Sequence, residues 1–239
     1  MQSLKRTEDE APIGILLFGT AGDRIAGDPG AQGTFPFPVR RGVVEGSYRD
    51  LIEGSPQACG RLCQAARDLE EQGVSAIAGD CGLMALYQRQ LAACVRVPVV
   101  SSSLILLPLV RTLVGSEGKI GILTGHSALL SARHLQAAGA GADENIFVEG
   151  METQPHFRQV VLEGTCPQEY DKMARDVLRA VEHLLQRSGA LDAVMLECSN
   201  LATFAWEISS RYKIPVFDIN LAIQMLHATL HQTCYQRQV

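Results

Sequence analysis

Two eight-residue segments of this chain, Val74-Ser-Ala-Ile-Ala-Gly-Asp-Cys81 and Leu191-Asp-Ala-Val-Met-Leu-Glu-Cys198, share an apolar pattern and end in the same residue. From each cysteine onward the two halves align without a gap, because Pro98 lies 17 residues after Cys81 and Pro215 lies 17 residues after Cys198. Short apolar runs of this kind are typical of strands buried in a parallel sheet. The sequence therefore predicts that one structural unit occurs twice.

The elements around these segments also occur in pairs. Each half is predicted to open with an apolar strand (13–18 and 120–124) and to continue into an amphipathic helix that ends at a glycine (56–72 and 167–188). A helical segment follows each cysteine (83–94 and 201–212), and a further short strand follows each proline (99–100 and 216–217). This alternation predicts an α/β fold with two pseudo-symmetric lobes, each a parallel sheet flanked by helices, and an active site in the cleft between the lobes.

The repeat also predicts the domain boundaries. We expect lobe 1 to span residues 12–104 and lobe 2 to span residues 105–217. A C-terminal helix within 218–239 is expected to pack back on lobe 1. Residues 1–11 are polar and mixed in charge, and we expect them to form a disordered tail.

Composition excludes several classes of protein. The chain has 239 residues, 46% of them hydrophobic, and a formal net charge of −5, which argues against binding to nucleic acid. It has neither an apolar run of about 18 residues nor the apolar stretch of a secretory signal, so we expect a cytoplasmic protein without a membrane partner. Its seven cysteines are an odd number, which favours free thiols in a reducing compartment.

The positions of Cys81 and Cys198 suggest a chemistry. Ligands of open α/β sheets bind at the carboxyl ends of the strands, where both cysteines lie. A helix N-terminus after each cysteine is expected to lower the pKa of its thiol, so that one sulfur removes a proton from a carbon and the other returns one from the opposite face. Adjacent residues of an extended strand point to opposite faces, so we expect Asp80 and Glu197 to point away from the thiols. Such a reaction needs no cofactor.

The carbanion formed in this reaction must be stabilised by hydrogen-bond donors. The candidates are hydroxyls, amides and glycine backbone groups near the predicted strand ends: Gly19, Thr20, Gly82, Ser102, Thr124, Ser127, Ser199 and Asn200.

Other motifs carry weaker signals. The glycine-rich stretch 19–33 matches neither a P-loop nor a dinucleotide fingerprint, and we interpret residues 19–47 as a long loop over the cleft. Cys59 and Cys63 are expected to pack in the core. The spacing of His227, His231 and Cys234 is one that a metal ion could use, but an exposed helix face is the favoured interpretation, and we expect no metal site. His126 is either a polar residue of the cleft or an ordinary loop residue.

The duplicated layout, with Gly-Asp-Cys81-Gly-Leu in one half and Glu-Cys198-Ser-Asn-Leu in the other, resembles the aspartate/glutamate racemase superfamily. That group includes hydantoin racemases, maleate isomerases and arylmalonate decarboxylases. The resemblance covers residues 13–228 and implies a cofactor-independent isomerase in which each lobe contributes a catalytic cysteine, here Cys81 and Cys198. It also implies a small carboxylate-bearing substrate, such as aspartate, glutamate or a derivative, and a possible homodimer. The segment Thr34-Phe-Pro-Phe-Pro-Val39 resembles a loop of one branch of the superfamily, which adds Thr34 to the candidates.

The sequence departs from the resemblance in ways that leave alternatives open. Amino-acid racemases usually carry Asn-Thr after the first cysteine and Thr after the second, where this chain has Gly82-Leu83 and Ser199. The presence of both cysteines disfavours the decarboxylases, which keep only the second. A maleate-type cis–trans isomerase, a hydantoin racemase and a non-catalytic two-lobed protein that binds small anions remain alternatives.

Overall fold

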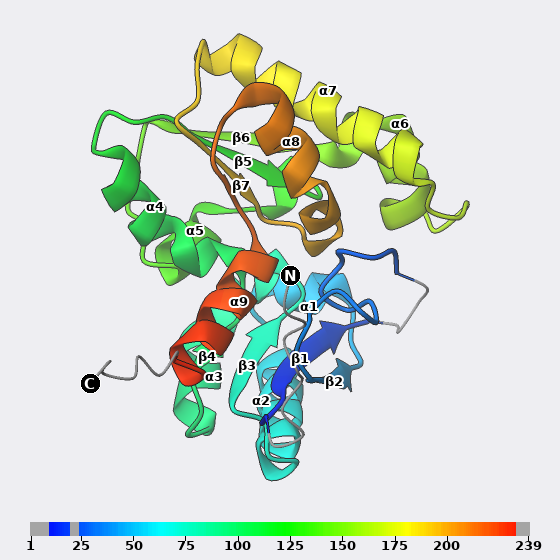
Figure 1. The fold of residues 1–239 in the computed structure, drawn as a ribbon, viewed down its shortest axis with the longest axis vertical. Coiled ribbons are helices and arrows are strands. Elements are labelled where there is room, and N and C mark those ends of the chain that lie inside the picture. Colours follow the sequence, from blue (N-terminus) through cyan, green and yellow to red (C-terminus); the bar gives the residue numbers. More distant parts are fainter. Residues whose placement is uncertain (1–9, 20–23, 233–239) are drawn as a thin grey trace, which may run out of the picture.

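The computed structural model describes residues 10–19 and 24–232, which form two lobes with one four-stranded sheet each (Figure 1). The strand orders are β2-β1-β3-β4 and β6-β5-β7-β8, and every pairing is parallel. The registers of the two sheets correspond, since Ile13 pairs with Ala76 in the first and Ile120 pairs with Ala193 in the second. The predicted two-lobed α/β fold is confirmed.

The first sheet consists of β1 (Ile13–Phe18), β2 (Val39–Val44), β3 (Ala76–Gly79) and β4 (Val99–Val100). The second consists of β5 (Ile120–Thr124), β6 (Ile146–Gly150), β7 (Ala193–Leu196) and β8 (Val216–Phe217). Among them β2 and β6 are edge strands that the sequence analysis missed. The interpretation of residues 19–47 as one long loop is therefore wrong, because β2 occupies its last part. Val39-Arg-Arg-Gly-Val-Val44 lacks a continuous apolar run because an edge strand is half exposed.

The α-helices of the first lobe are α1 (Tyr48–Glu53), α2 (Pro56–Glu71) and α3 (Gln88–Cys94). Those that follow are α4 (Leu107–Val114), α5 (Ala132–Ala137), α6 (Pro155–Phe157), α7 (Tyr170–Ser188), α8 (Ala205–Tyr212) and α9 (Ile219–Leu230). Ser55 caps α2 by accepting a hydrogen bond from the backbone N–H of Ala58, and Pro56 occupies the first turn. The helices predicted after the two cysteines begin as 3-10 segments, at Gly82–Tyr87 and Ser199–Phe204, before α3 and α8 continue them.

Side chains on the two faces of each sheet belong to different hydrophobic clusters. In β1, Leu16 and Phe18 pack toward α2, whereas Ile13, Ile15 and Leu17 face the other side. The corresponding side of the second sheet and apolar residues of α4 and α9 join that same cluster. The two lobes therefore share one buried core, which fixes the relative position of the two sheets.

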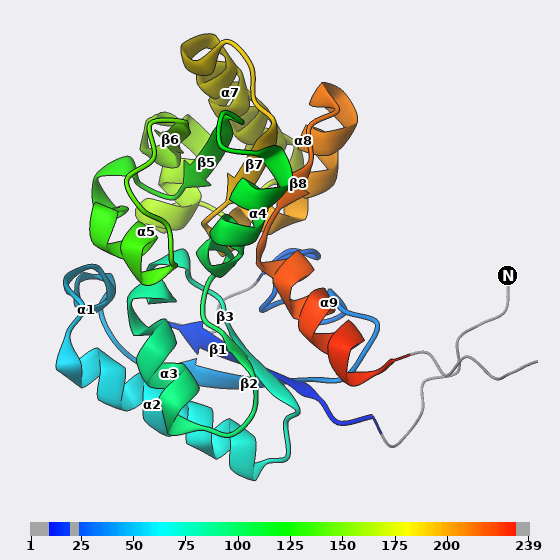
Figure 2. The same cartoon turned by 90° about the vertical axis from the view of Figure 1, so that its left-hand side faces the viewer.

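The helix α9 follows the second sheet in sequence but packs against β3 of the first, and it also contacts the 3-10 segments Ser103–Leu106 and Ser199–Phe204 (Figure 2). Most of the predicted tail over residues 1–11 lies outside the described residues. In the part of the chain that the structure describes, no helix combines the length and apolarity that a membrane span requires.

Candidate active site

A cavity of about 340 Å³ lies between the lobes, and both Cys81 and Cys198 line it. Each cysteine lies two residues after an inner strand of its sheet, β3 in the first lobe and β7 in the second. Each also precedes a 3-10 segment, so the two halves present their sulfur-bearing residues from equivalent positions. The remaining lining residues are Arg24, Tyr48, Asp80, Gly82, Leu83, Thr124, Gly125, His126, Leu129, Val161, Leu162, Glu197, Ser199 and Asn200.

The structure brings together six of the residues singled out from the sequence: Cys81, Gly82, Thr124, Cys198, Ser199 and Asn200. The oxygen of the Asn200 amide lies 3.6 Å from the sulfur of Cys198, in position to accept a hydrogen bond from its thiol. His126, for which two interpretations stood open, lies in the cavity wall.

Four other candidates are not among the cavity-lining residues. Thr34 donates a hydrogen bond to the carbonyl of Asp28 and stabilises its own loop, and Ser102 caps a 3-10 segment at the backbone N–H of Leu104. Ser127 pairs with Glu152, and Gly19 ends β1 with a positive φ of 91°. Thr20 lies outside the described residues.

The expectation that Asp80 and Glu197 point away from the thiols is wrong, since both residues line the cavity and the charges of both raise the pKa of each thiol. Glu197 is buried, and one of its oxygens accepts a hydrogen bond of 2.8 Å from the hydroxyl of Thr124. Its other oxygen has no hydrogen-bond partner among the described residues and lies against Gly82, where any Cβ would overlap the carboxylate. Glycine after the first cysteine therefore makes room for the carboxylate that precedes the second.

Asp80 differs from Glu197 because it has a cationic partner. The guanidinium of Arg24 contacts Asp80 at 2.8 Å and Asp28 at 2.9 Å, and Asp80 also accepts a hydrogen bond from the backbone N–H of Phe18. Asp28 in turn accepts a hydrogen bond from the side-chain amide of Asn200. Arg24 thus links its own loop to Asp80 at the end of β3 and, through Asp28, to Asn200 in the second lobe.

Both thiols have a pKa above the ordinary value, contrary to the expectation that helix N-termini would lower it. Burial is the largest cause for each, and the charge of Glu197 is the next. The following segments are 3-10 turns, and the hydrogen bonds from the backbone at Leu83 and Asn200 oppose the shift without reversing it. The charge of Cys198 also raises the pKa of Cys81, which agrees with the position of both groups on one cavity. Both sulfurs are therefore protonated near neutral pH when the cavity holds no ligand.

Burial also raises the pKa of the carboxylates, to about 7 for Glu197 and to about 6 for Asp80, where Arg24 opposes the shift. Near neutral pH, Glu197 is therefore charged in part of the molecules and neutral in the rest. It can accept a proton from a neighbouring thiol, and its neutralisation removes the charge that holds the thiol pKa high.

Arg24 and Tyr48 are site residues that the sequence analysis missed. Neither belongs to a motif or to the repeated unit. Arg24 comes from residues 19–47, the segment interpreted as a loop, and Tyr48 directly follows that segment as the first residue of α1. Tyr48 is 57% exposed at the edge of the cavity, with its ring packed against that of Phe18. The symmetric positions of Asp80 and Glu197, each directly before a cysteine, could have indicated that they belong to the site. The alternation of side chains along a strand instead predicted that they lie on the face of the sheet opposite to the thiols.

The raised pKa of Glu197 predicts a pH-dependent cost to folding. A carboxyl whose pKa is higher in the folded state opposes folding increasingly as pH rises from its ordinary pKa of 4.5 to about 7. Glu197→Gln removes this charge and keeps the shape, so we expect a gain in the free energy of unfolding on the order of 3 kcal/mol at pH 8 and almost none at pH 4.5. Urea unfolding of both proteins at the two pH values measures the difference.

The matched control for this comparison is Glu53→Gln, a change in a glutamate whose side chain is 58% exposed, which we expect to alter stability little at either pH. A loss of stability in Glu197→Gln that is equal at both pH values would contradict the assignment, since it would show that the carboxylate is needed for its hydrogen bonds alone.

Comparison with known proteins identifies the family. A family model described as Asp/Glu/Hydantoin racemase matches residues 45–225. The chain is 28% identical over 216 residues to a dimethylsulfoniopropionate lyase of Durusdinium sp. clade D, which covers 87% of this chain and 71% of that protein. It is 25% identical over 221 residues to dimethylsulfoniopropionate lyase 3 of Emiliania huxleyi, which covers 88% of this chain and 57% of that longer protein.

Solved structures share the fold. Unliganded arylmalonate decarboxylase superposes with a TM-score of 0.57 at 16% identity, with 96% of both chains covered. Aspartate racemase of Picrophilus torridus gives a TM-score of 0.57 at 14% identity, covering 92% of this chain and 94% of that one. Allantoin racemase from Klebsiella pneumoniae gives 0.54 at 19% identity, covering 95% and 97%. The match of the family model over most of the chain, together with this shared two-lobed fold, shows that the chain belongs to the Asp/Glu/Hydantoin racemase family.

Proposed function

We propose that this chain is a cofactor-independent racemase or epimerase that acts on the carbon next to a carboxylate, in an amino acid such as aspartate or glutamate or in a derivative. The observation that carries the proposal is the single cavity lined by Cys81 from one lobe and Cys198 from the other. Two proton carriers that approach from different lobes suit inversion of a stereocentre, because the proton leaves on one face and returns on the other.

In the proposed reaction one thiol first transfers its proton to Glu197, whose pKa of about 7 makes it an acceptor near neutral pH. The resulting thiolate removes the α-proton of the substrate, and the opposite thiol donates its proton to the other face. The backbone N–H groups after the two cysteines and the hydroxyl of Ser199 are the proposed donors to the substrate carboxylate as it gains charge. Transfer of the proton from Glu197 to the second cysteine, which is left as a thiolate after it donates to the product, restores the starting protonation of the enzyme.

A second candidate is elimination of dimethyl sulfide from dimethylsulfoniopropionate, which the names of the relatives suggest. The reaction begins with the same removal of a proton next to a carboxylate. The electron pair then forms the carbon–carbon double bond as the carbon–sulfur bond breaks, which yields acrylate, dimethyl sulfide and one proton. The acidic residues Asp80 and Glu197 and the aromatic ring of Tyr48 in the cavity wall favour this candidate, because a sulfonium cation is stabilised by negative charge and by aromatic faces.

One experiment separates the two candidates. The protein is incubated in heavy water with aspartate, glutamate, hydantoins and dimethylsulfoniopropionate, each separately, and proton NMR follows the signal next to the carboxylate. Racemase activity exchanges that proton and produces the other enantiomer, whereas lyase activity yields acrylate with dimethyl sulfide in the headspace. A compound that binds in the cavity and undergoes neither exchange nor elimination, with all the others inert, would support the small-anion binding protein instead.

A further inference from the structure

A second cluster of ligating side chains lies outside the cavity. Glu10, in the segment before β1, meets His227 of α9 and His231, the residue directly after that helix, and one ligand atom from each of the three lies within 4.8 Å of the others. The Nε2 atom of His227 is 2.5 Å from Oε1 of Glu10, and Nδ1 of His231 is 3.6 Å from the same oxygen. None of the three residues lines the cavity, so the proposed function leaves them unexplained.

The chemistry and spacing of these side chains match a transition-metal site. Two histidines four residues apart, one in the last turn of α9 and one at its C-cap, form a His2Glu set with the carboxylate, which leaves the fourth position of a tetrahedral ion to water. With bonds of about 2.0 to 2.1 Å, the ligand atoms of such an ion lie about 3.3 Å apart. The two distances to the Glu10 oxygen fall on either side of that separation, and the stacked ring of His231 has to rotate for the three atoms to converge on one ion.

Packing holds two of the three ligands in place. The ring of His227 stacks on Phe37 with centroids 3.9 Å apart and an interplanar angle of 6°, and His231 stacks on the other side of His227 at 4.5 Å. Phe37 is itself buried, so the first ring rests on a fixed surface. The side chain of Glu10 is only 14% exposed, and the more exposed His231 leaves a path for an ion to enter.

We propose that Glu10, His227 and His231 bind one divalent transition-metal ion of the Zn2+ class, which fastens the segment before β1 to the end of α9. Soft or borderline ions are favoured because two of the three ligands are imidazoles. Since α9 belongs to the core shared by both lobes, the bound ion stabilises the junction between them.

The test is a titration of the full chain, freed of metal by a chelator, with Zn2+ in competition with a chromophoric indicator. We expect one Zn2+ per chain and a rise in Tm on binding. His231→Ala and Glu10→Gln each remove one ligand and are expected to weaken binding at least tenfold and to abolish the rise in Tm. Circular dichroism verifies that the variants fold, and His231→Ala changes the most exposed of the three side chains.

His183 provides a matched control, because it also pairs with a glutamate, Glu149, at 3.3 Å. The third residue of that group is Arg187, which cannot bind a metal ion, whereas the proposed site has a second histidine. His183→Ala is expected to leave both stoichiometry and affinity unchanged. Zinc binding that is unaffected by His231→Ala and Glu10→Gln, or that disappears only when the cysteines are alkylated, would overturn the proposal. Absence of zinc binding by the wild-type chain would also overturn the proposal. The cluster would then be interpreted as a hydrogen-bonded contact between Glu10 and His227.

Discussion

Replacing either Cys81 or Cys198 by alanine is expected to abolish inversion of the substrate, with a fall in kcat of about 10²- to 10⁴-fold, the usual contribution of one acid–base group. Inversion needs a donor and an acceptor on opposite faces, so both variants should lose it. Each variant can still exchange the α-proton of the one enantiomer that faces its remaining thiol. Circular dichroism of the substrate measures inversion, and NMR in heavy water measures exchange in each starting enantiomer.

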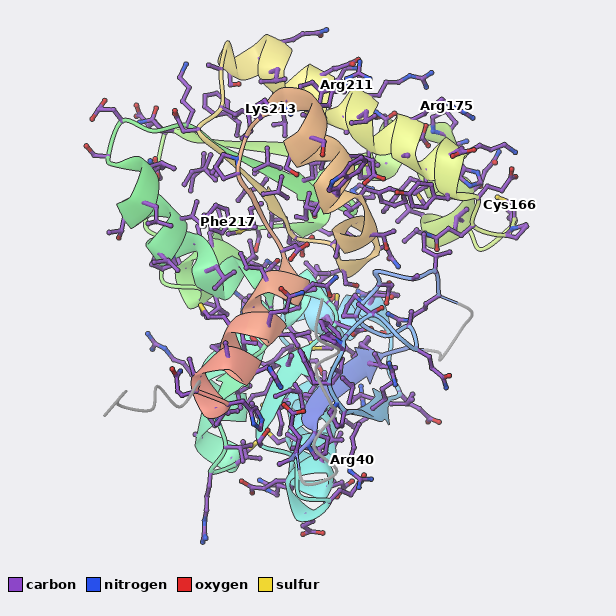
Figure 3. The ribbon with its side chains drawn as sticks, in the orientation of Figure 1. Arg40, Cys166, Arg175, Arg211, Lys213 and Phe217 are labelled. Atoms are coloured by element: carbon purple, nitrogen blue, oxygen red, sulfur yellow. The ribbon has the colours of Figure 1, made fainter. Side chains whose placement is uncertain are left out.

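The same pair of variants distinguishes the two candidate reactions. Elimination requires removal of one proton and no return to the opposite face, so only one of the two substitutions is expected to abolish release of dimethyl sulfide. Cys166→Ser is the control, because Cys166 is a half-buried cysteine at the outer edge of the second lobe and does not line the cavity (Figure 3). Full activity in both alanine variants would rule out the cysteine chemistry altogether.

Arg24→Met is expected to destabilise the fold by about 3 to 5 kcal/mol at pH 7, the usual effect of removing one partner from a buried ion pair. The substitution leaves Asp28 and Asp80, whose side chains are 3% and 4% exposed, without their shared cation. The carboxylate of Asp80, whose pKa burial raises to about 6, then opposes folding while it is charged, and the loss should shrink as pH falls and this group becomes protonated. Urea unfolding between pH 4.5 and pH 8 measures this dependence.

Arg49→Met provides the matched control for Arg24→Met. Arg49 also pairs with a carboxylate, that of Glu53 at 2.7 Å, but its side chain is 82% exposed. We expect almost no change in stability at any pH, because a solvated ion pair contributes little. A similar small loss in Arg24→Met would show that water or a rearranged loop replaces the guanidinium, and would contradict its role as the link between the two carboxylates.

Local pattern was sufficient to predict the repeated unit. The buried central strands of both sheets consist of apolar runs, and the helix over residues 56–72 carries a cap, a proline and a terminal glycine, so each can be recognised within a window of a few residues. The equal spacing from each cysteine to its proline then predicted two matching lobes, and the family model and the shared fold bear this out. The edge strand β2 was not predicted because a half-exposed strand lacks such a run, and β6 was not predicted although it begins with three apolar residues.

The electrostatics of the site could not be predicted in this way. By itself the sequence determined the duplicated α/β fold and placed one cysteine after the same strand in each half, because hydrophobic periodicity and turn residues act over short distances. Only the tertiary structure decided that Glu197 reaches Gly82, that Arg24 joins Asp28 to Asp80, and that burial raises the thiol pKa. These properties depend on which groups from distant segments meet in one cavity and on how much water that cavity excludes, and both are set by the packing of the two lobes.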